Sequence, residues 1–228
     1  PGYNTSKKLL DRLGLKGVLR SDVIVGSGVE AYETLDKALD SIAMSKFEDA
    51  ERLISQLRTM FYSNVEINNI VLEYLEIWLQ MLKDEVEFSE VVNRLESLLP
   101  FKYSEIGKYK YLVKHERMIL STYIECLGKM EKYEAITDYD KMTSWITNEL
   151  SKKQFASIFE DLNMRYANLY GNAGHYEKSD RIAEEGIRIE IECERMHCLN
   201  TLLYCRAWNA GERGNVSEND KELCRCAY

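Results

Sequence analysis

The sequence predicts an all-α protein made of about five consecutive helix-turn-helix units, an α-solenoid. Apolar residues recur at three- and four-residue spacing along nearly the whole chain, which is the period of an amphipathic helix. Only 2 prolines occur in 228 residues, so the windows between helix breakers are long. Similar turn signatures recur roughly every forty residues, and a fixed period of this length is typical of stacked helix pairs.

Each predicted helix is marked by a stripe of apolar residues on one face. The first stripe contains Leu35, Ala38 and Ile42, and sustained alternation with period two, which would indicate strands, is absent. In chain order the stripes cover residues 35–42, 53–57, 70–81, 91–99, 118–127, 136–146, 155–170, 182–191 and 199–207.

Aromatic residues beside acidic or polar ones mark the turns inside the pairs. The turn centres are Phe47, Phe88, Tyr133, Tyr176 and the weaker Val216, separated by 41, 45, 43 and 40 residues. They predict a repeat domain over residues 30–228, preceded by a linker over residues 1–29. Because the chain opens on Pro1 rather than Met, we expect a further domain before the linker.

The segment 23–31 departs from the helical pattern. Val23-Ile24-Val25 followed by Gly26, Gly28 and Ala31 resembles a strand and the Gly-x-Gly-x-x-Ala turn of dinucleotide-binding proteins. That chemistry needs a parallel sheet behind the turn, and the rest of the chain offers no second strand. We therefore interpret the segment as a linker that ends in a capping box formed by Ser27 and Glu30.

The charge balance and the apolar runs exclude several classes of protein. The 38 acidic and 30 basic residues give a net charge of -8, whereas gripping nucleic acid needs a basic face. The longest apolar runs are broken by charges within a few residues, which predicts no membrane span. The N-terminus lacks the basic and apolar regions of a secretory signal. We therefore expect a cytoplasmic protein.

The cysteines lie in helical surroundings and none is arranged as Cys-x-x-Cys. They are Cys126, Cys193, Cys198, Cys205, Cys224 and Cys226. A metal site built on Cys193 and His197, with Cys198 and Cys205 nearby, is the alternative, but these four residues do not share one helix face. We predict reduced cysteines that pack as small hydrophobic residues, with no metal and no cofactor.

The turn at Leu169-Tyr170-Gly171-Asn172-Ala173-Gly174-His175-Tyr176-Glu177-Lys178-Ser179 resembles the turn of a tetratricopeptide repeat (TPR). Ala167, Ala183 and Gly186 match the small positions where paired helices of that family touch. Ser45 replaces the turn glycine in the first unit, and the period exceeds the usual thirty-four residues of the family. The resemblance implies a right-handed superhelix of about five TPR-like repeats.

Longer, degenerate repeats of this kind resemble the sensor domains of peptide-responsive transcription regulators of Gram-positive bacteria, the Rgg/PlcR/Rap (RRNPP) group. The opening segment Leu9-Leu10-Asp11-Arg12-Leu13-Gly14-Leu15 resembles the segment that follows the DNA-binding helix-turn-helix in those proteins. The resemblance implies a quorum-sensing domain that forms a homodimer and contacts DNA only through a domain outside this chain.

The inner groove of such a superhelix is lined by the first helix of each pair, and it binds a peptide through polar side chains and apolar pockets. Counting back from the turns places particular residues on this groove. The candidate peptide-binding residues are Glu76, Gln80, Glu125, Asp161, Arg165, Asn168, Asn172, Tyr204 and Trp208, with Glu73, Ser121, Met164 and Thr201 beside them. Asn168 and Asn172 are the strongest candidates, because an amide donates to and accepts from a peptide bond.

Two further expectations concern this groove. Glu73, Glu76 and Glu125 favour a ligand that carries a positive charge. Trp78, Trp145 and Trp208 lie within apolar stripes, which favours the core over a binding platform.

The predicted function is therefore the binding of a short signalling peptide by a transcription regulator. The sequence contains no His-Glu-x-x-His and no Gly-x-Ser-x-Gly motif, and we expect no enzymatic activity. One alternative is a constitutive scaffold whose groove holds a protein partner. Another is a modulator of response regulators like the Rap phosphatases, which would need a three-helix bundle before the repeats.

Overall fold

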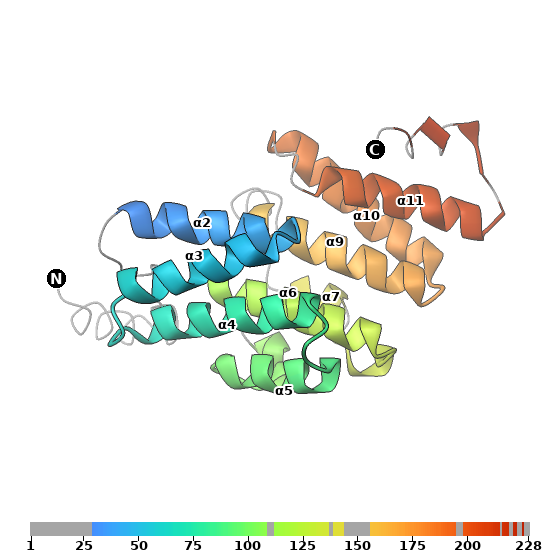
Figure 1. Ribbon diagram of the computed structural model, residues 1–228. Coiled ribbons are helices and arrows are strands. Elements are labelled where there is room, and N and C mark those ends of the chain that lie inside the picture. The colour runs from blue at the N-terminus through green and yellow to red at the C-terminus, as the bar shows by residue number, and fades with distance from the viewer. Residues whose placement is uncertain are drawn as a thin grey trace, which may run out of the picture. The chain divides into compact units, whose positions relative to one another are not determined.

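The computed structural model describes residues 29–108, 112–136, 139–143, 156–194, 198–214, 216–218, 221–222 and 225. This described part is all-helical and contains no strand, so the predicted fold class is confirmed at that level (Figure 1). The chain divides into two compact units. The N-terminal unit consists of Pro1–Tyr103 and Tyr109–Ile119, and the C-terminal unit consists of Ser104–Lys108 and Leu120–Tyr228.

Neighbouring helices pack against one another in the N-terminal unit. Its helices are α2 (Val29–Ala43), α3 (Phe47–Met60), α4 (Glu66–Leu82) and α5 (Phe88–Leu98). Each contacts the next, and α2 also contacts α4, so that the first helix of one pair touches the first helix of the following pair. Ala38 and Ala50, on α2 and α3, are fully buried and allow a close approach of these two helices.

The same arrangement recurs in the C-terminal unit. Helix α6 (Lys114–Lys129) ends in this unit, and η2 (Tyr133–Ala135), α7 (Tyr139–Thr143), α9 (Ala156–Asn172), α10 (Tyr176–Glu192) and α11 (Leu199–Glu212) follow. Helix α10 contacts both α9 and α11, and α9 also contacts α11 directly. The three helices therefore lie side by side, with α9 and α11 in contact along one face.

A left-handed residue closes several of the helices. Ser45, Glu131 and Gly174 have φ values of 56°, 56° and 78°, and each lies two residues before the aromatic residue of its turn. At Gly174 the backbone N–H donates to Gly171, and the next N–H, of His175, donates to Tyr170 at 2.8 Å. This pair of bonds is a Schellman motif, which satisfies the carbonyl groups at a helix end. Phe47, Phe88 and Tyr176 then begin α3, α5 and α10.

Small residues let the helices of the C-terminal unit approach closely. A Cβ atom added at Gly186 of α10 would lie 2.8 Å from Leu202 Cδ1 of α11 and 3.0 Å from Asn163 Cβ of α9. Ala167 and Ala183 are fully buried. The small positions that the sequence predicted at 167, 183 and 186 are thus helix contacts.

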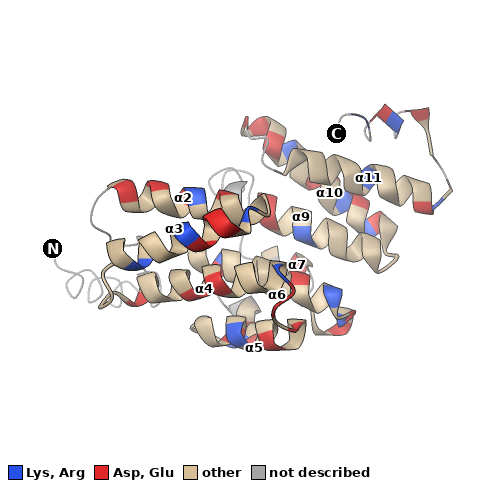
Figure 2. Cartoon of the chain, in the orientation of Figure 1, with Lys and Arg blue, Asp and Glu red and all other residues tan. Residues whose placement is uncertain are grey.

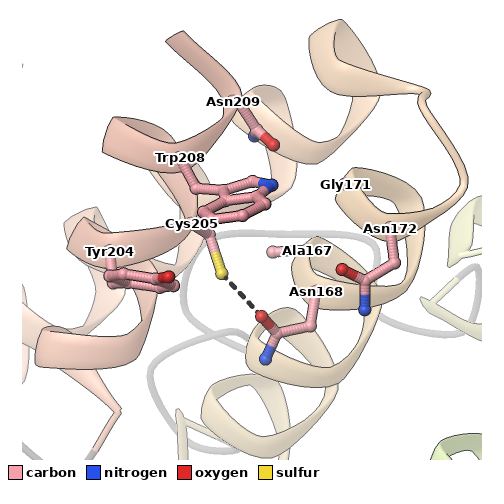
Figure 3. A pocket seen from close by; sticks show the side chains of 8 residues that line it. All are labelled: Ala167, Asn168, Gly171, Asn172, Tyr204, Cys205, Trp208 and Asn209. Atoms are coloured by element: carbon pink, nitrogen blue, oxygen red, sulfur yellow. Dashed lines mark hydrogen bonds between the residues drawn. The ribbon is translucent and has the colours of Figure 1, made fainter. Parts of the chain in front are cut away.

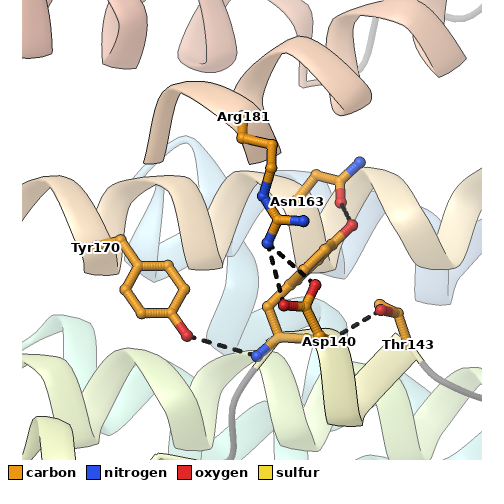
Figure 4. Close-up of polar contacts among 6 residues, drawn as sticks. Asp140, Thr143, Asn163, Tyr170 and Arg181 are labelled. Carbon is orange, nitrogen blue, oxygen red and sulfur yellow. Dashed lines mark hydrogen bonds and ion pairs between the residues drawn. The ribbon is translucent and has the colours of Figure 1, made fainter. Parts of the chain in front are cut away.

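Polar contacts hold the short helix α7 against α9 and α10 (Figure 4). The buried Tyr139 hydroxyl donates to Asn163 Oδ1 at 2.5 Å, and Tyr139 N–H points to the Tyr170 hydroxyl at 3.5 Å. Arg181 Nη2 of α10 lies 3.0 Å and 3.2 Å from the two carboxylate oxygens of Asp140. Burial raises the pKa of the Tyr139 hydroxyl above its ordinary value, so this group stays protonated as a donor.

Two helix boundaries differ from the stripes in the sequence. The stripe 91–99 extends one residue past α5, because Leu99 precedes Pro100 and adopts an extended backbone with ψ of 140°. The stripe 136–146 begins before its helix, because Ile136 is extended with ψ of 123° and α7 starts at Tyr139. The spacing of apolar residues indicates which face of a helix is buried. It does not indicate whether the first or last apolar residue has a helical backbone.

Several predictions concern residues outside the described part. These are the linker with its glycine motif, apart from its last residues, the opening segment 9–15, Trp145, Cys224 and Cys226. Among the residues that are described, no helix is both long enough and apolar enough to cross a membrane.

Candidate functional site

The site lies between α9 and α11, where two small residues of α9 leave space beside α11. Ala167 is fully buried, and Gly171 lies one turn further along the same face. Leu202, Cys205 and Asn209 form the buried stripe of α11. Tyr204 and Trp208 stand next to this stripe, and they are 36% and 48% exposed.

Four of the predicted groove residues line one pocket in this place (Figure 3). We refer to it as the α9–α11 pocket, and its volume is about 180 Å³. Asn168, Asn172, Tyr204 and Trp208 were predicted from the sequence. The lining also includes residues that the sequence analysis did not select for the groove, namely Ala167, Gly171, Cys205 and Asn209.

Cys205 fixes the orientation of the Asn168 amide. Its thiol donates to Asn168 Oδ1 at 3.0 Å, and Figure 3 shows the sulfur directed at this oxygen. Burial raises the pKa of the Cys205 thiol to about 12, so the sulfur carries its proton at neutral pH. With Oδ1 engaged in this way, the NH₂ group of Asn168 is the part of the amide that presents donors.

Asn209 is held by α10. Its Nδ2 donates to Ser179 Oγ at 2.8 Å and to Asp180 Oδ1 at 2.7 Å, and Ser179 Oγ in turn donates to the carbonyl of Ala167 at 2.6 Å. Arg213 Nη2 lies 2.5 Å from the other carboxylate oxygen of Asp180. These contacts determine which end of the Asn209 amide is nitrogen, since only NH₂ can donate to a carboxylate.

Among the residues that the structure describes, the oxygen of Asn209 has no hydrogen-bond partner, although the residue is fully buried. It lies 2.9 Å from the place that a Cβ atom would take at Gly171, which lines the α9–α11 pocket. A buried acceptor without a partner costs about 1–3 kcal/mol of folding free energy.

A second pocket adjoins the first through shared residues. The α6–α9 pocket has a volume of about 300 Å³ and, like the first, is lined by Asn168 and Asn172. Its other lining residues are Ile124, Glu125, Gly128, Lys129, Arg165 and Leu169. The two asparagines therefore stand between the pockets, where one extended ligand would contact both.

Two of the three charged residues that line the α6–α9 pocket compensate each other, and Lys129 is the third. Arg165 Nη1 lies 2.7 Å from Glu125 Oε2, and Arg165 Nε donates to Ser121 Oγ at 2.9 Å. Both side chains of the ion pair are about three-quarters buried, with 24% and 23% exposed. The carboxylate of Glu125, which was expected to attract a positive ligand, is engaged by this arginine.

Charged residues are unevenly distributed over the three helices (Figure 2). Helix α10 carries charges along its whole length, whereas α11 carries only Arg206 and Glu212. On α9 the last seven residues, 166–172, are uncharged. The α9–α11 pocket is consequently lined by uncharged side chains alone.

Glu76 and Gln80 lie in the N-terminal unit, in a pocket between α3 and α4. Glu76 forms an ion pair with Arg58 of α3, and Gln80 Oε1 accepts a hydrogen bond from Arg94 Nη1 at 2.8 Å. In the same pocket, hydrogen bonds to Glu51 and Glu85 raise the pKa of Lys83 to about 12. Glu76 and Gln80 were predicted from helical register, but their side chains are engaged by arginines of neighbouring helices.

The other predicted residues have separate places. Asp161 and Met164 are half-buried on α9, Thr201 is half-buried on α11, and Glu73 is exposed on α4. The expectation that Trp208 lies in the core is wrong, because almost half of its side chain is exposed. Trp208 instead lines the α9–α11 pocket.

Asn209 and Cys205 were missed by the sequence analysis because they lie on the buried stripe of α11. The sequence does carry a signal for Asn209. Residues 202, 205 and 209 form an apolar stripe of the helix, and an amide within such a stripe needs a hydrogen-bond partner or has a function.

The described cysteines are free thiols, and no cluster of His, Cys, Asp and Glu in the described ranges could hold a metal ion. Burial raises the pKa of Cys126 and Cys198 to about 12, as it does for Cys205.

No protein-family model, no curated protein and no solved structure matches this chain.

Proposed function

We propose that this chain is a peptide-sensing domain that binds a short, extended peptide across the α9–α11 and α6–α9 pockets. The observation that carries the proposal is the convergence of Asn168, Asn172, Tyr204 and Trp208 on one pocket. The sequence predicts all four as groove residues, by counting back from the turns of the TPR-like repeats. Amides beside aromatic rings are suited to a peptide, since the amides match its backbone and the rings its side chains.

The packing of the helices supports a TPR-like organisation. The consecutive helices α2 to α5 contact each other, as do α9 to α11, and alternate helices make the additional contacts α2–α4 and α9–α11. Small residues occupy the closest helix contacts at Ala167, Ala183 and Gly186. A superhelix of about five such pairs, with its first helices lining the groove, is part of the proposal.

A binding role is favoured over a catalytic one by the state of the described thiols. Three of the four have pKa values raised by burial to about 12, which leaves too little thiolate for a nucleophile at neutral pH. In the proposed mechanism the peptide stabilises one conformation of the repeat domain by binding it more tightly than the other. A DNA-binding domain outside this chain and a homodimer would transmit that change.

The direct test is a selection of peptides from a randomised pool of synthetic heptapeptides. Peptides that co-elute with the protein in gel filtration are identified by mass spectrometry, and the best is labelled and titrated by fluorescence anisotropy. We expect Asn172→Ala to weaken binding about thirtyfold, since two lost hydrogen bonds of roughly 1 kcal/mol each amount to that factor.

Asn93→Ala is the matched control, because Asn93 is an exposed asparagine on α5 in the N-terminal unit. We expect this variant to bind like the wild type. Failure to retain any peptide, or equal affinity of the Asn172→Ala protein, would contradict the proposal. Retention of a folded protein domain in place of peptides would favour the scaffold.

A further inference from the structure

We infer that the α9–α11 pocket reads one residue of the bound peptide and selects an uncharged aromatic side chain, whose backbone C=O accepts from Asn168. The inference rests on the proposed function, and it adds the chemistry of the ligand. Three features of the pocket carry it: its rings, the oriented donor group of Asn168 and its lack of charge.

The rings of Tyr204 and Trp208 form the exposed wall of the pocket. Their centroids are 6.1 Å apart and the ring planes are inclined by 33°. Opposite them, Ala167 and Gly171 have little or no side chain, which gives the pocket its depth. A third ring placed here would meet Trp208 in an edge-to-face or offset arrangement, which contributes about 0.5–1.5 kcal/mol beyond the burial of area.

One polar group of the pocket complements the carbonyl of a peptide bond. The Asn168 NH₂ group presents donors because Cys205 engages its oxygen, and a peptide C=O can accept from it. This contact holds the Asn168 amide in orientation, so the ligand need not order it.

The lack of charge makes the pocket selective. None of its eight lining residues is Asp, Glu, Lys, Arg or His, and burial raises the pKa of the Cys205 thiol to about 12. A lysine or glutamate side chain of the peptide would lose hydration without gaining a counter-ion, which is costly. A phenylalanine side chain meets no such cost.

The experiment uses the protein labelled with 5-fluorotryptophan and observed by ¹⁹F NMR. The Trp208 resonance is assigned with Trp208→Phe, and Trp78 on α4 serves as an internal reference. The probes are N-acetyl-phenylalanine methylamide and its glutamate and lysine counterparts. We expect the phenylalanine probe to shift the Trp208 resonance in a saturable manner, and the charged probes to bind at least tenfold more weakly.

Gly171→Ala tests the role of the pocket floor. The added Cβ would narrow the pocket and approach Asn209 Oδ1 to 2.9 Å, so that side chain must shift, and the affinity for the phenylalanine probe should fall at least tenfold. Gly211→Ala is the matched control: Gly211 is also the penultimate residue of its helix, and a Cβ there has no neighbour within 4 Å. Its affinity should stay within twofold of wild type.

Tyr204→Lys keeps the inference testable if Gly171→Ala fails to fold. Tyr204 is partly exposed, so the lysine is tolerated, and its positive charge should reverse the preference toward the glutamate probe. Equal binding of the three probes to wild type, or an unchanged preference in Tyr204→Lys, would overturn the inference.

The outcome separates this inference from the proposed function. Selected heptapeptides that bind without moving the Trp208 resonance would overturn the inference and leave peptide binding intact. A phenylalanine probe that binds at Trp208, with no heptapeptide retained from the pool, would support the pocket and contradict the peptide-sensing function.

Discussion

Gly174 has a φ of 78°, a backbone conformation that residues with a Cβ atom adopt only at a cost in free energy. Ser45 and Glu131 hold the same conformation at the equivalent positions of two other turns, with φ of 56° at both. The turn geometry is therefore imposed by the Schellman hydrogen bonds, and glycine makes it less costly where it occurs.

Gly174→Ala should lower the free energy of unfolding by about 1 kcal/mol, since a Cβ there meets no atom within 4 Å and only the backbone is strained. Urea denaturation followed by circular dichroism measures this. Gly211 lies in helix α11, and a Cβ atom there has no neighbour within 4 Å. Gly211→Ala should instead raise the free energy of unfolding by about 0.5–1 kcal/mol. Changes of the same sign in the two variants would refute the backbone explanation.

The buried thiols predict a dependence of stability on alkaline pH. Burial raises the folded-state pKa of Cys126 and Cys205 to about 12 from an ordinary value of 9.0. Because the unfolded chain loses these protons first, their contribution is complete below pH 9 and is lost as the pH rises toward 12. Each thiol should steepen the fall by up to about 1.4 kcal/mol per pH unit.

Comparing wild type with Cys126→Ala isolates this effect, because the lysines and tyrosines that titrate in the same range are common to both proteins. Urea unfolding at pH 8, 9.5 and 10.5 should show a shallower decline for the variant. Parallel declines would mean that Cys126 ionises as easily in the folded protein as in the unfolded chain.

Among the helices, the contact of α10 with α9 and α11 is the closest. The Cβ of Gly186→Ala would have to displace Leu202 and Asn163, which lie 2.8 Å and 3.0 Å from its position. We expect the free energy of unfolding to fall by about 1–3 kcal/mol, as overpacked interiors do. The measurement is a urea melt beside Gly211→Ala, and a stability equal to that control would show that the helices separate without cost.

The sequence was sufficient for the helices because their cause is local. Each apolar stripe buries one helix face, and the positive-φ turns follow from the short connections within the pairs. Leu99 and Ile136 were assigned to helices wrongly, since the proline after Leu99 and the turn before Tyr139 act on the backbone and leave the apolar spacing unchanged.

The residues of the candidate site could be predicted only where the position of a residue along its helix determines which side chains surround it. Asn168, Asn172, Tyr204 and Trp208 project from two helices that touch, so counting residues places them together. Glu76 and Gln80 satisfy the same count, but Arg58 and Arg94 on neighbouring helices engage them. A partner that is distant in sequence cannot be read from spacing within one helix.

At the scale of the whole molecule, the division into two units places both pockets of the proposed groove in the C-terminal unit. A selected heptapeptide should therefore slow amide hydrogen exchange at the exposed ends of α9 and α11. Exchange in α2 and α3 should change little, because their contacts lie within the N-terminal unit. Hydrogen exchange with mass spectrometry resolves these segments, and protection confined to α2 and α3 would place the ligand elsewhere.

The ion pair of Arg165 and Glu125 has a consequence for the kinetics of binding. With this pair closed and the α9–α11 pocket uncharged, Lys129 is the remaining charge among the residues that line the two pockets, so the groove exerts only a weak long-range attraction on a ligand. Association should then proceed at the unsteered rate of about 10⁵–10⁶ M⁻¹s⁻¹ and change little between low and high ionic strength. The acidic character of the chain would keep it dispersed in solution while the groove selects its ligand by shape and hydrogen bonding.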